Sequence, residues 1–250
     1  MHQKGLLTYA LNLIGNLVYI DEVDTGQLCN CYCPSCKEKL VAKNGGMKRV
    51  HHFAHASGVD CENAYETMLH QLAKLRVQEA FLSKEVFNVG FEYRSYCPHV
   101  KTCAFVRYGN CYISTHKRFN LKEFYDSYEQ EIQYDSINRR SDLKIFSSKK
   151  PQLAPIYIEF FVTHASDVSK LHNGGKIIEV KIESENDIQR IVDDGFIESS
   201  KCDSRLLEGI ESENISETTF WGFKSEDYDA KNITQEIEFS RYILYASGKS

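Results

Sequence analysis

Residues 140–182 contain Arg140-Ser-Asp-Leu-Lys-Ile-Phe146, then Pro155-Ile-Tyr-Ile-Glu-Phe-Phe-Val-Thr-His164, then Gly174-Gly-Lys-Ile-Ile-Glu-Val-Lys-Ile182. Each run is an apolar β-type segment that carries an acid. A carboxylate among Ile, Tyr, Phe and Val is costly to bury without a partner. If Asp142 and Glu159 lie on adjacent strands, they could share one Mg²⁺ or Mn²⁺, because such ions prefer oxygen ligands. The alternative is that one acid caps a turn and the other pairs with an arginine.

The segment between the second and third runs, Ser166 to His172, has the pattern of a crossover helix. A helical crossover makes residues 156–162 and 176–182 parallel neighbours in one sheet. We therefore predict an α/β fold in which a mixed sheet is flanked by helices and preceded by a small β-rich metal-binding module. The expected domains are residues 1–61, residues 62–200 with a β insertion at 86–118, and a C-terminal extension over 201–250.

Several smaller elements complete this prediction. A short helix is expected over 121–128, and a peripheral helix over 187–192. The segments 220–223 and 236–245 are expected to return a strand to a sheet edge.

The composition favours a folded chain in the cytoplasm. The 250 residues are 42% hydrophobic and 12% aromatic, which supports a substantial core. Neither a membrane-length apolar run nor a signal-peptide pattern is visible. Nine cysteines in a cytoplasmic chain favour metal ligation over disulfides. The net charge of −5 limits nucleic-acid binding to a local basic surface.

The N-terminal cysteines predict a structural zinc site. Cys33-Pro-Ser-Cys36 has the spacing with which two thiolates bind one Zn²⁺, and His52, His55 and Cys61 compete for the other two positions. Cys29 and Cys31 are expected to lie outside the site. The alternative is a set of buried thiols with a redox pair.

A second zinc site is a weaker hypothesis. Its ligands would be Cys97, Cys103 and Cys111, with His99 or His116. The spacing is irregular, and half-buried thiols in strands are the stronger interpretation.

Residues 62–82 show helical periodicity. Glu66, His70 and Lys74 are four residues apart, so they form one stripe beside the apolar face. Such a stripe is either a solvated ladder of weak pairs or the route by which a helical acid reaches the strand acids.

The order of these motifs resembles the competence protein CoiA-like family. The resemblance covers roughly residues 8–182 and rests on Cys33-xx-Cys36, His52-Phe-Ala-His55, the stripe from Glu66 to Lys74, Arg140-Ser-Asp142, and Glu159 with Val162-Thr-His164. It implies a restriction-endonuclease-like, PD-(D/E)XK fold and metal-dependent hydrolysis of DNA. It also implies a role in DNA uptake or in defence against foreign DNA.

By this resemblance, Asp142 and Glu159 are the strand acids and Glu66 is the helical acid, with His70 beside it as a further catalytic candidate. The family lysine falls at Phe161, where a cation would be needed to orient water and offset charge. We rank the replacements as Lys170, then Lys144, then Lys181. His164 would contact phosphate or hold the crossover helix; the alternative is an ordinary strand-end histidine.

The expected function is a Mg²⁺- or Mn²⁺-dependent DNA endonuclease with a structural Zn²⁺. Arg139, Arg140 and Lys74 would contact phosphates without reading sequence. The first alternative is an inactive nuclease-fold module that binds DNA or a partner protein, such as an ATPase from the same locus. A zinc-dependent hydrolase is a weaker alternative, since four protein ligands would close the zinc to water. A homodimer is also compatible with the sequence.

Overall fold

The fold is taken from a computed structural model of the chain. It describes residues 5–59, 61–96, 99, 102, 112–133, 140–163, 176–198, 218–221, 223–224 and 238–239.

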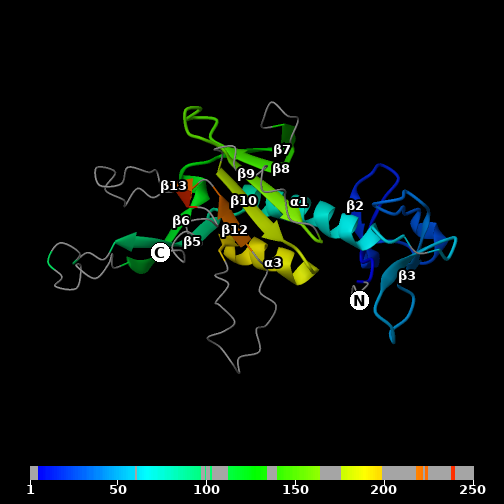
Figure 1. The fold of residues 1–250 in the computed structure, drawn as a ribbon. Coiled ribbons are helices and arrows are strands. Elements are labelled where there is room, and N and C mark those ends of the chain that lie inside the picture. The colour runs from blue at the N-terminus through cyan, green and yellow to red at the C-terminus, as the bar shows by residue number, and fades with distance from the viewer. Residues whose placement is uncertain are drawn as a thin grey trace, which may run out of the picture.

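A five-stranded sheet forms the centre of the molecule (Figure 1), with the strand order β12-β10-β9-β8-β7. Its strands are β7 (Ser127–Gln133), β8 (Arg140–Phe146), β9 (Ile156–Phe161), β10 (Lys176–Lys181) and β12 (Thr218–Trp221). Strands β9 and β10 pair in parallel, which confirms the predicted parallel neighbours, while the other pairs are antiparallel. The predicted C-terminal edge strand is β12. The crossover itself lies outside the described residues.

The middle of one face of this sheet is apolar. Ile158 is opposite Leu143 on β8 and Ile178 on β10, and all three side chains are buried. Because side chains alternate along a strand, the intervening positions, including Glu159 and Lys181, project from the other face.

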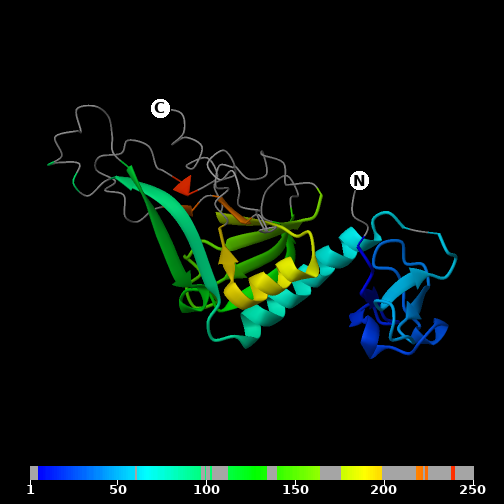
Figure 2. The ribbon, with the colours of Figure 1, turned by 90° about the horizontal axis from the view of Figure 1, so that it is seen from below.

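Two α-helices occur in the described ranges, α1 (Ala64–Ser83) and α3 (Glu185–Asp194). They pack against each other beneath the apolar face of the sheet (Figure 2). The helix expected over 187–192 is therefore longer than predicted and is not peripheral, because Ile188 and Ile191 are buried. Neither helix is long and apolar enough to cross a membrane.

A second sheet extends from the far end of α1. It contains β5 (Asn88–Tyr96), β6 (Tyr112–Asn120) and β11 (Phe196–Ile197). Phe91 on β5 packs against Phe220 and Phe223, which joins this sheet to the C-terminal strands β12 and β13 (Phe223–Lys224). Strand β13 pairs with β14 (Glu238–Phe239).

The helix predicted over 121–128 is wrong. The chain makes one turn of 3₁₀ helix, η4 (Leu121–Glu123), and then enters β7 at Ser127. Leu121 is completely buried, and its N–H donates to the carbonyl of Phe87, so tertiary packing ends the helix after one turn.

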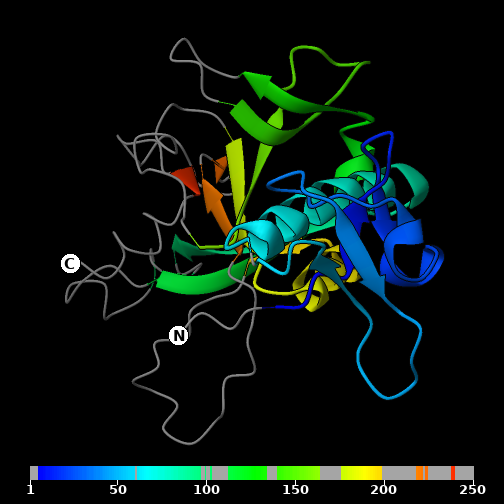
Figure 3. The same ribbon diagram turned by 90° about the vertical axis from the view of Figure 1, so that its right-hand side faces the viewer.

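The N-terminal module consists of short elements at the N-terminal end of α1 (Figure 3). They are β1 (Tyr9–Leu11), β2 (Leu17–Tyr19), η1 (Ile20–Glu22), η2 (Gln27–Cys29), β3 (Leu40–Lys43) and β4 (His52–His55). Its buried side chains, such as Leu7 and Phe53, belong to the same hydrophobic cluster as Met68 and Leu69 of α1.

Candidate functional site

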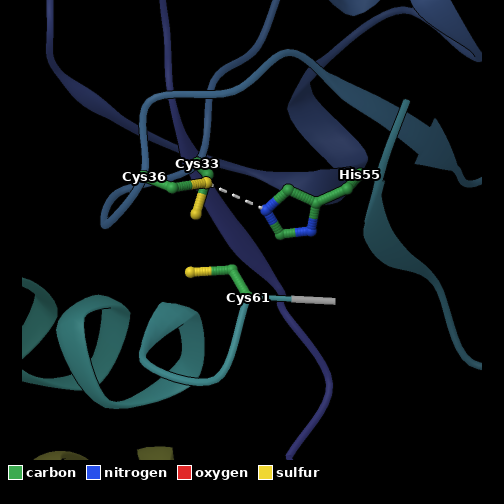
Figure 4. A group of neighbouring side chains, drawn as sticks. All are labelled: Cys33, Cys36, His55 and Cys61. Carbon is green, nitrogen blue, oxygen red and sulfur yellow. Dashed lines mark hydrogen bonds between the residues drawn. The ribbon is translucent and has the colours of Figure 1, made fainter. Parts of the chain in front are cut away.

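Three cysteines and one histidine converge in the N-terminal module. The ligand atoms of Cys33, Cys36, His55 and Cys61 all lie within 4.8 Å of one another. Cys36 Sγ is 3.3 Å from His55 Nε2 (Figure 4). The turn Cys33–Cys36, here called the knuckle, is closed by hydrogen bonds from Lys37 N to Cys33 O and from Cys33 N to Glu38 O. His55 ends β4, and Cys61 lies just before α1, so three separate segments meet here.

The chemistry of this cluster fits a zinc ion. Burial raises the pKa of the Cys33 thiol to about 11. At Cys61, partial burial opposes ionisation, but hydrogen bonds from the Ser35 side chain and the Asn63 backbone outweigh it, so the pKa of that thiol is lowered. A metal must displace the thiol protons, and three sulfurs with one imidazole are a donor set that Zn²⁺ favours. The cluster can therefore hold a metal, and its donors match zinc.

The structure selects among the predicted ligands. His52 and His55 are three residues apart on β4, so their side chains project from opposite faces of the strand. His55 faces the knuckle, whereas His52 Nδ1 lies 2.9 Å from the carbonyl of Val50 and outside the cluster. The three-residue spacing of the two histidines was the signal in the sequence that only one of them could face the cysteines, if they lie on a strand.

Of the cysteines that the structure describes, Cys29 and Cys31 do not join this cluster. Cys31 is completely buried, and burial raises its pKa to about 12, which is the behaviour of an apolar core residue. Cys29 Sγ is directed to the carbonyl of Leu40. Cys97, Cys103 and Cys111 of the second predicted site lie outside the described residues.

Asp142 lies where the central strands separate. The β8–β9 ladder ends at the pair Leu143 and Ile158. Beyond it, the Phe160 N–H donates to Asp142 Oδ2 at 2.8 Å, and His70 Nε2 lies 3.0 Å from the same oxygen. Continued by one residue, the register sets Asp142 opposite Glu159. The carboxylate of Asp142 thus replaces the backbone pairing at the point where the strands splay.

The helical stripe reaches this splay. Glu66 Oε1 accepts a hydrogen bond from Thr163 Oγ1 at 2.8 Å, just after the end of β9. His70, one turn further along α1, reaches Asp142 on β8. Helix α1 therefore connects both strands through two side chains on one stripe. Thr163 was not singled out as a site residue, although it is part of the Val162-Thr-His164 motif.

Glu179 is a second residue that was not singled out as a site residue. It is in register with Glu159 on the parallel neighbour β10, and both side chains are buried, at 2% and 5% exposure. Two adjacent carboxylates in a low-dielectric environment repel when both are ionised, so they need protons, donors or a cation between them. The matching Ile158-Glu159 and Ile178-Glu179 dipeptides were the available signal.

Of the remaining predicted site residues, the structure describes Lys74 and Arg140, and no hydrogen bond or ion pair of either with Asp142 or Glu159 is found among the described residues. Lys74 Nζ lies 2.8 Å from Glu131 Oε1, and this hydrogen bond lowers the pKa of Glu131. Arg140 is exposed at the start of β8. Arg139, His164 and Lys170 lie outside the described residues. Within the described ranges, the cysteine cluster is the one group of three or more potential ligands whose atoms converge, so Glu66, Asp142 and Glu159 are not gathered to that degree.

Comparisons with known proteins bear on the N-terminal module. Neither the curated proteins nor the solved structures contain a match. A family model, Competence protein CoiA, N-terminal domain, matches residues 20–64. This range includes Cys33, Cys36, His55 and Cys61 and ends at the first residue of α1. The match supports the relationship of this chain to the CoiA-like family through its N-terminal module.

Proposed function

We propose that the protein is a metal-dependent nuclease that hydrolyses DNA phosphodiester bonds, in the processing of foreign DNA or in defence against it. Asp142 and Glu159 are its strand acids, and Glu66 is the acid contributed by α1. The resemblance in motif order suggested this function. The observation that carries it is the splay of β8 and β9 at Asp142, where side chains of α1 contact both strands.

The acids suit a divalent cation in kind and number. Mg²⁺ commonly uses one or two protein carboxylates and completes its shell with water and substrate phosphate. Asp142 and Glu159 would hold it, with the adjacent Glu179 adding negative charge. Bound there, Mg²⁺ or Mn²⁺ would activate water and neutralise charge on the phosphate. His70, through its contact with Asp142 Oδ2, would keep that carboxylate oriented.

The strand register distinguishes between the lysines that could replace the family lysine at the position of Phe161. Lys144 is opposite Tyr157 on β9. Tyr157 is four residues before Phe161, so Lys144 lies roughly 13 Å along the strand from the position of the usual lysine. Its ammonium also lies 2.8 Å from Glu129 Oε2. Lys181 is the register partner of Phe161 on β10 and lies on the same face. Among the lysines that the structure describes, this register favours Lys181, whose Nζ lies 2.8 Å from Glu183 Oε1.

A second candidate function is a nuclease-fold module that binds DNA or a protein without cutting. The residue that favours it is Phe161, an apolar side chain at the position of the usual lysine. The two functions differ in a measurable way, because only the nuclease requires Asp142 for bond cleavage.

The test is cleavage of supercoiled and single-stranded DNA by zinc-loaded protein, with Mg²⁺ or Mn²⁺ added or omitted. Omission is preferable to a chelator, which would also remove zinc. Asp142→Asn is expected to lower the cleavage rate on the order of 100-fold or more, because it weakens metal binding at the reacting phosphate. Lys181→Ala is expected to lower the rate to a similar degree.

Asp193→Asn is the matched control, since this acid is exposed on α3 and hydrogen-bonds to Gln189. It should cut as the parent does. Equal cleavage by the parent and Asp142→Asn would refute the proposal. DNA binding without cleavage under every metal condition would support the inactive module instead.

A further inference from the structure

The hairpin of β3 and β4, with the residues directly beside it, is a basic region in an acidic protein. Residues 39–59 contain no aspartate or glutamate, whereas the whole chain has a net charge of −5. The same segment carries Lys39, Lys43, Lys48 and Arg49. Such a local excess of cations complements a polyanion.

Every residue of the tip of this hairpin, residues 45–50, is exposed, and the tip projects from the N-terminal module (Figure 3). Met47 is fully exposed, and Val50 retains 68% of its surface. Lys48 and Arg49 lie between them and are exposed as well. Apolar side chains next to paired cations match a ligand with both charged and apolar parts, as nucleic acids have.

The base of the hairpin is held in place. Asn44 Nδ2 donates to the carbonyls of Ile20 and Val23, at 2.8 and 2.9 Å. His51 lies between the carboxylate of Asp21 and the carbonyl of Gly46, so both of its ring nitrogens face acceptors. The hydrogen bond to Asp21 raises the pKa of His51 and favours the doubly protonated ring that this arrangement needs. A fixed base supports a tip that is presented to a ligand in a defined direction.

We infer that the tip, residues 45–50, binds DNA. Lys48 and Arg49 would contact backbone phosphates, and Met47 would lie against sugars or bases. The choice of DNA as the polyanion rests on the proposed function. The contact itself rests on the charge and exposure of the loop.

The hairpin belongs to the N-terminal module, which is joined directly to α1, the helix that carries the proposed acid Glu66. Cys61, the last residue of the cysteine cluster, lies five positions before Glu66 on the N-terminal part of α1. DNA bound by the hairpin would therefore be bound by the module at the N-terminal end of α1, the end of the helix that carries Glu66 (Figure 1). The tip would add affinity and leave the chemistry of the acids unchanged.

The experiment measures DNA binding by fluorescence anisotropy in an Asp142→Asn background, loaded with zinc, so that cleavage does not interfere. Duplex and single-stranded DNA of one sequence are titrated between about 50 and 200 mM salt. Losing two phosphate contacts in Lys48→Ala/Arg49→Ala is expected to weaken duplex binding about 10-fold or more and to lower the salt slope by about 2. Met47→Ala is expected to weaken binding without changing the slope.

Lys149→Ala/Lys150→Ala is the matched control, because it removes two adjacent exposed lysines from the β8–β9 turn. It should leave affinity and slope unchanged. The inference is overturned if Lys48→Ala/Arg49→Ala binds like the parent, or if the control pair loses as much. Heparin, a polyanion without bases, is titrated in parallel. If Lys48→Ala/Arg49→Ala loses heparin binding as much as DNA binding, and Met47→Ala binds DNA like the parent, the contact of Met47 with DNA is refuted. Zinc content and circular dichroism verify that each variant is folded.

The outcome is independent of catalysis. Binding that depends on the hairpin would stand even if the parent protein did not cut DNA. Conversely, cleavage that depends on Asp142 would stand even if the hairpin variants bound normally.

Discussion

At the scale of single residues, the clearest distinction is between two histidines on one strand. His55 Nε2 lies beside Cys36 Sγ, whereas His52 projects from the opposite face of β4. We predict that the protein binds one zinc ion and that His55→Ala lowers zinc affinity at least about 100-fold, because it removes one of four ligands. His52→Ala should retain the affinity of the parent. Competition with a chromogenic zinc chelator measures both.

Cys29→Ser is a further control for this prediction, since Cys29 lies outside the converging group. Equal zinc affinities for His52→Ala and His55→Ala would contradict the assignment of His55. Normal zinc binding by a Cys61→Ser variant would contradict the role of the last cysteine.

At the scale of elements, α3 depends on one buried acid at its N-terminus. Asp187 Oδ2 accepts hydrogen bonds from the N–H groups of Glu183 and Ser184 and from the Ser184 hydroxyl, at 2.9–3.1 Å. Its other oxygen accepts from Arg190 at 2.8 Å. We predict that Asp187→Ala lowers the free energy of unfolding by about 2–3 kcal/mol, because several donors lose their acceptor. Urea denaturation measures the change.

The matched control is Asp193→Ala on the exposed side of the same helix. Its effect should stay within about 0.5 kcal/mol, as is usual for surface positions. Similar losses in the two variants would show that the capping network does not stabilise α3 as described.

At the scale of the whole molecule, the N-terminal module and the central sheet share one core. Tyr9 N lies 3.4 Å from Met68 Sδ, and Thr8 hydrogen-bonds to Glu185 at the start of α3. We predict that removing zinc lowers the melting temperature on the order of 10 °C, with one unfolding transition, because the loss of a tightly bound ligand destabilises a shared core. Differential scanning calorimetry with and without a chelator measures this.

Adding back zinc should restore the original melting temperature. Two separate transitions, of which only the first responds to the chelator, would show instead that the module unfolds independently of the sheet. An unchanged melting temperature would show that the cluster holds no stabilising metal.

The sequence by itself determined the local elements and the chemistry they carry. Apolar runs and a helical crossover pattern were sufficient to predict the parallel pairing of residues 156–162 with 176–182, because that connection has few geometric solutions. Helical periodicity located α1, and the spacing of Cys33 and Cys36 predicted two members of the cysteine and histidine cluster. These features depend on short-range patterns, which can be read directly from the residue order.

Only the tertiary structure decided which long-range partners these side chains meet. It selected His55 over His52, paired Lys74 with Glu131, and set Glu179 beside Glu159. It also limited the predicted helix to the single turn Leu121–Glu123, where packing outweighed the local tendency to continue. Strand register and packing arise from contacts between residues far apart in the chain. A shift of one residue in strand register would, for example, turn Glu159 or Glu179 to the opposite face of the sheet.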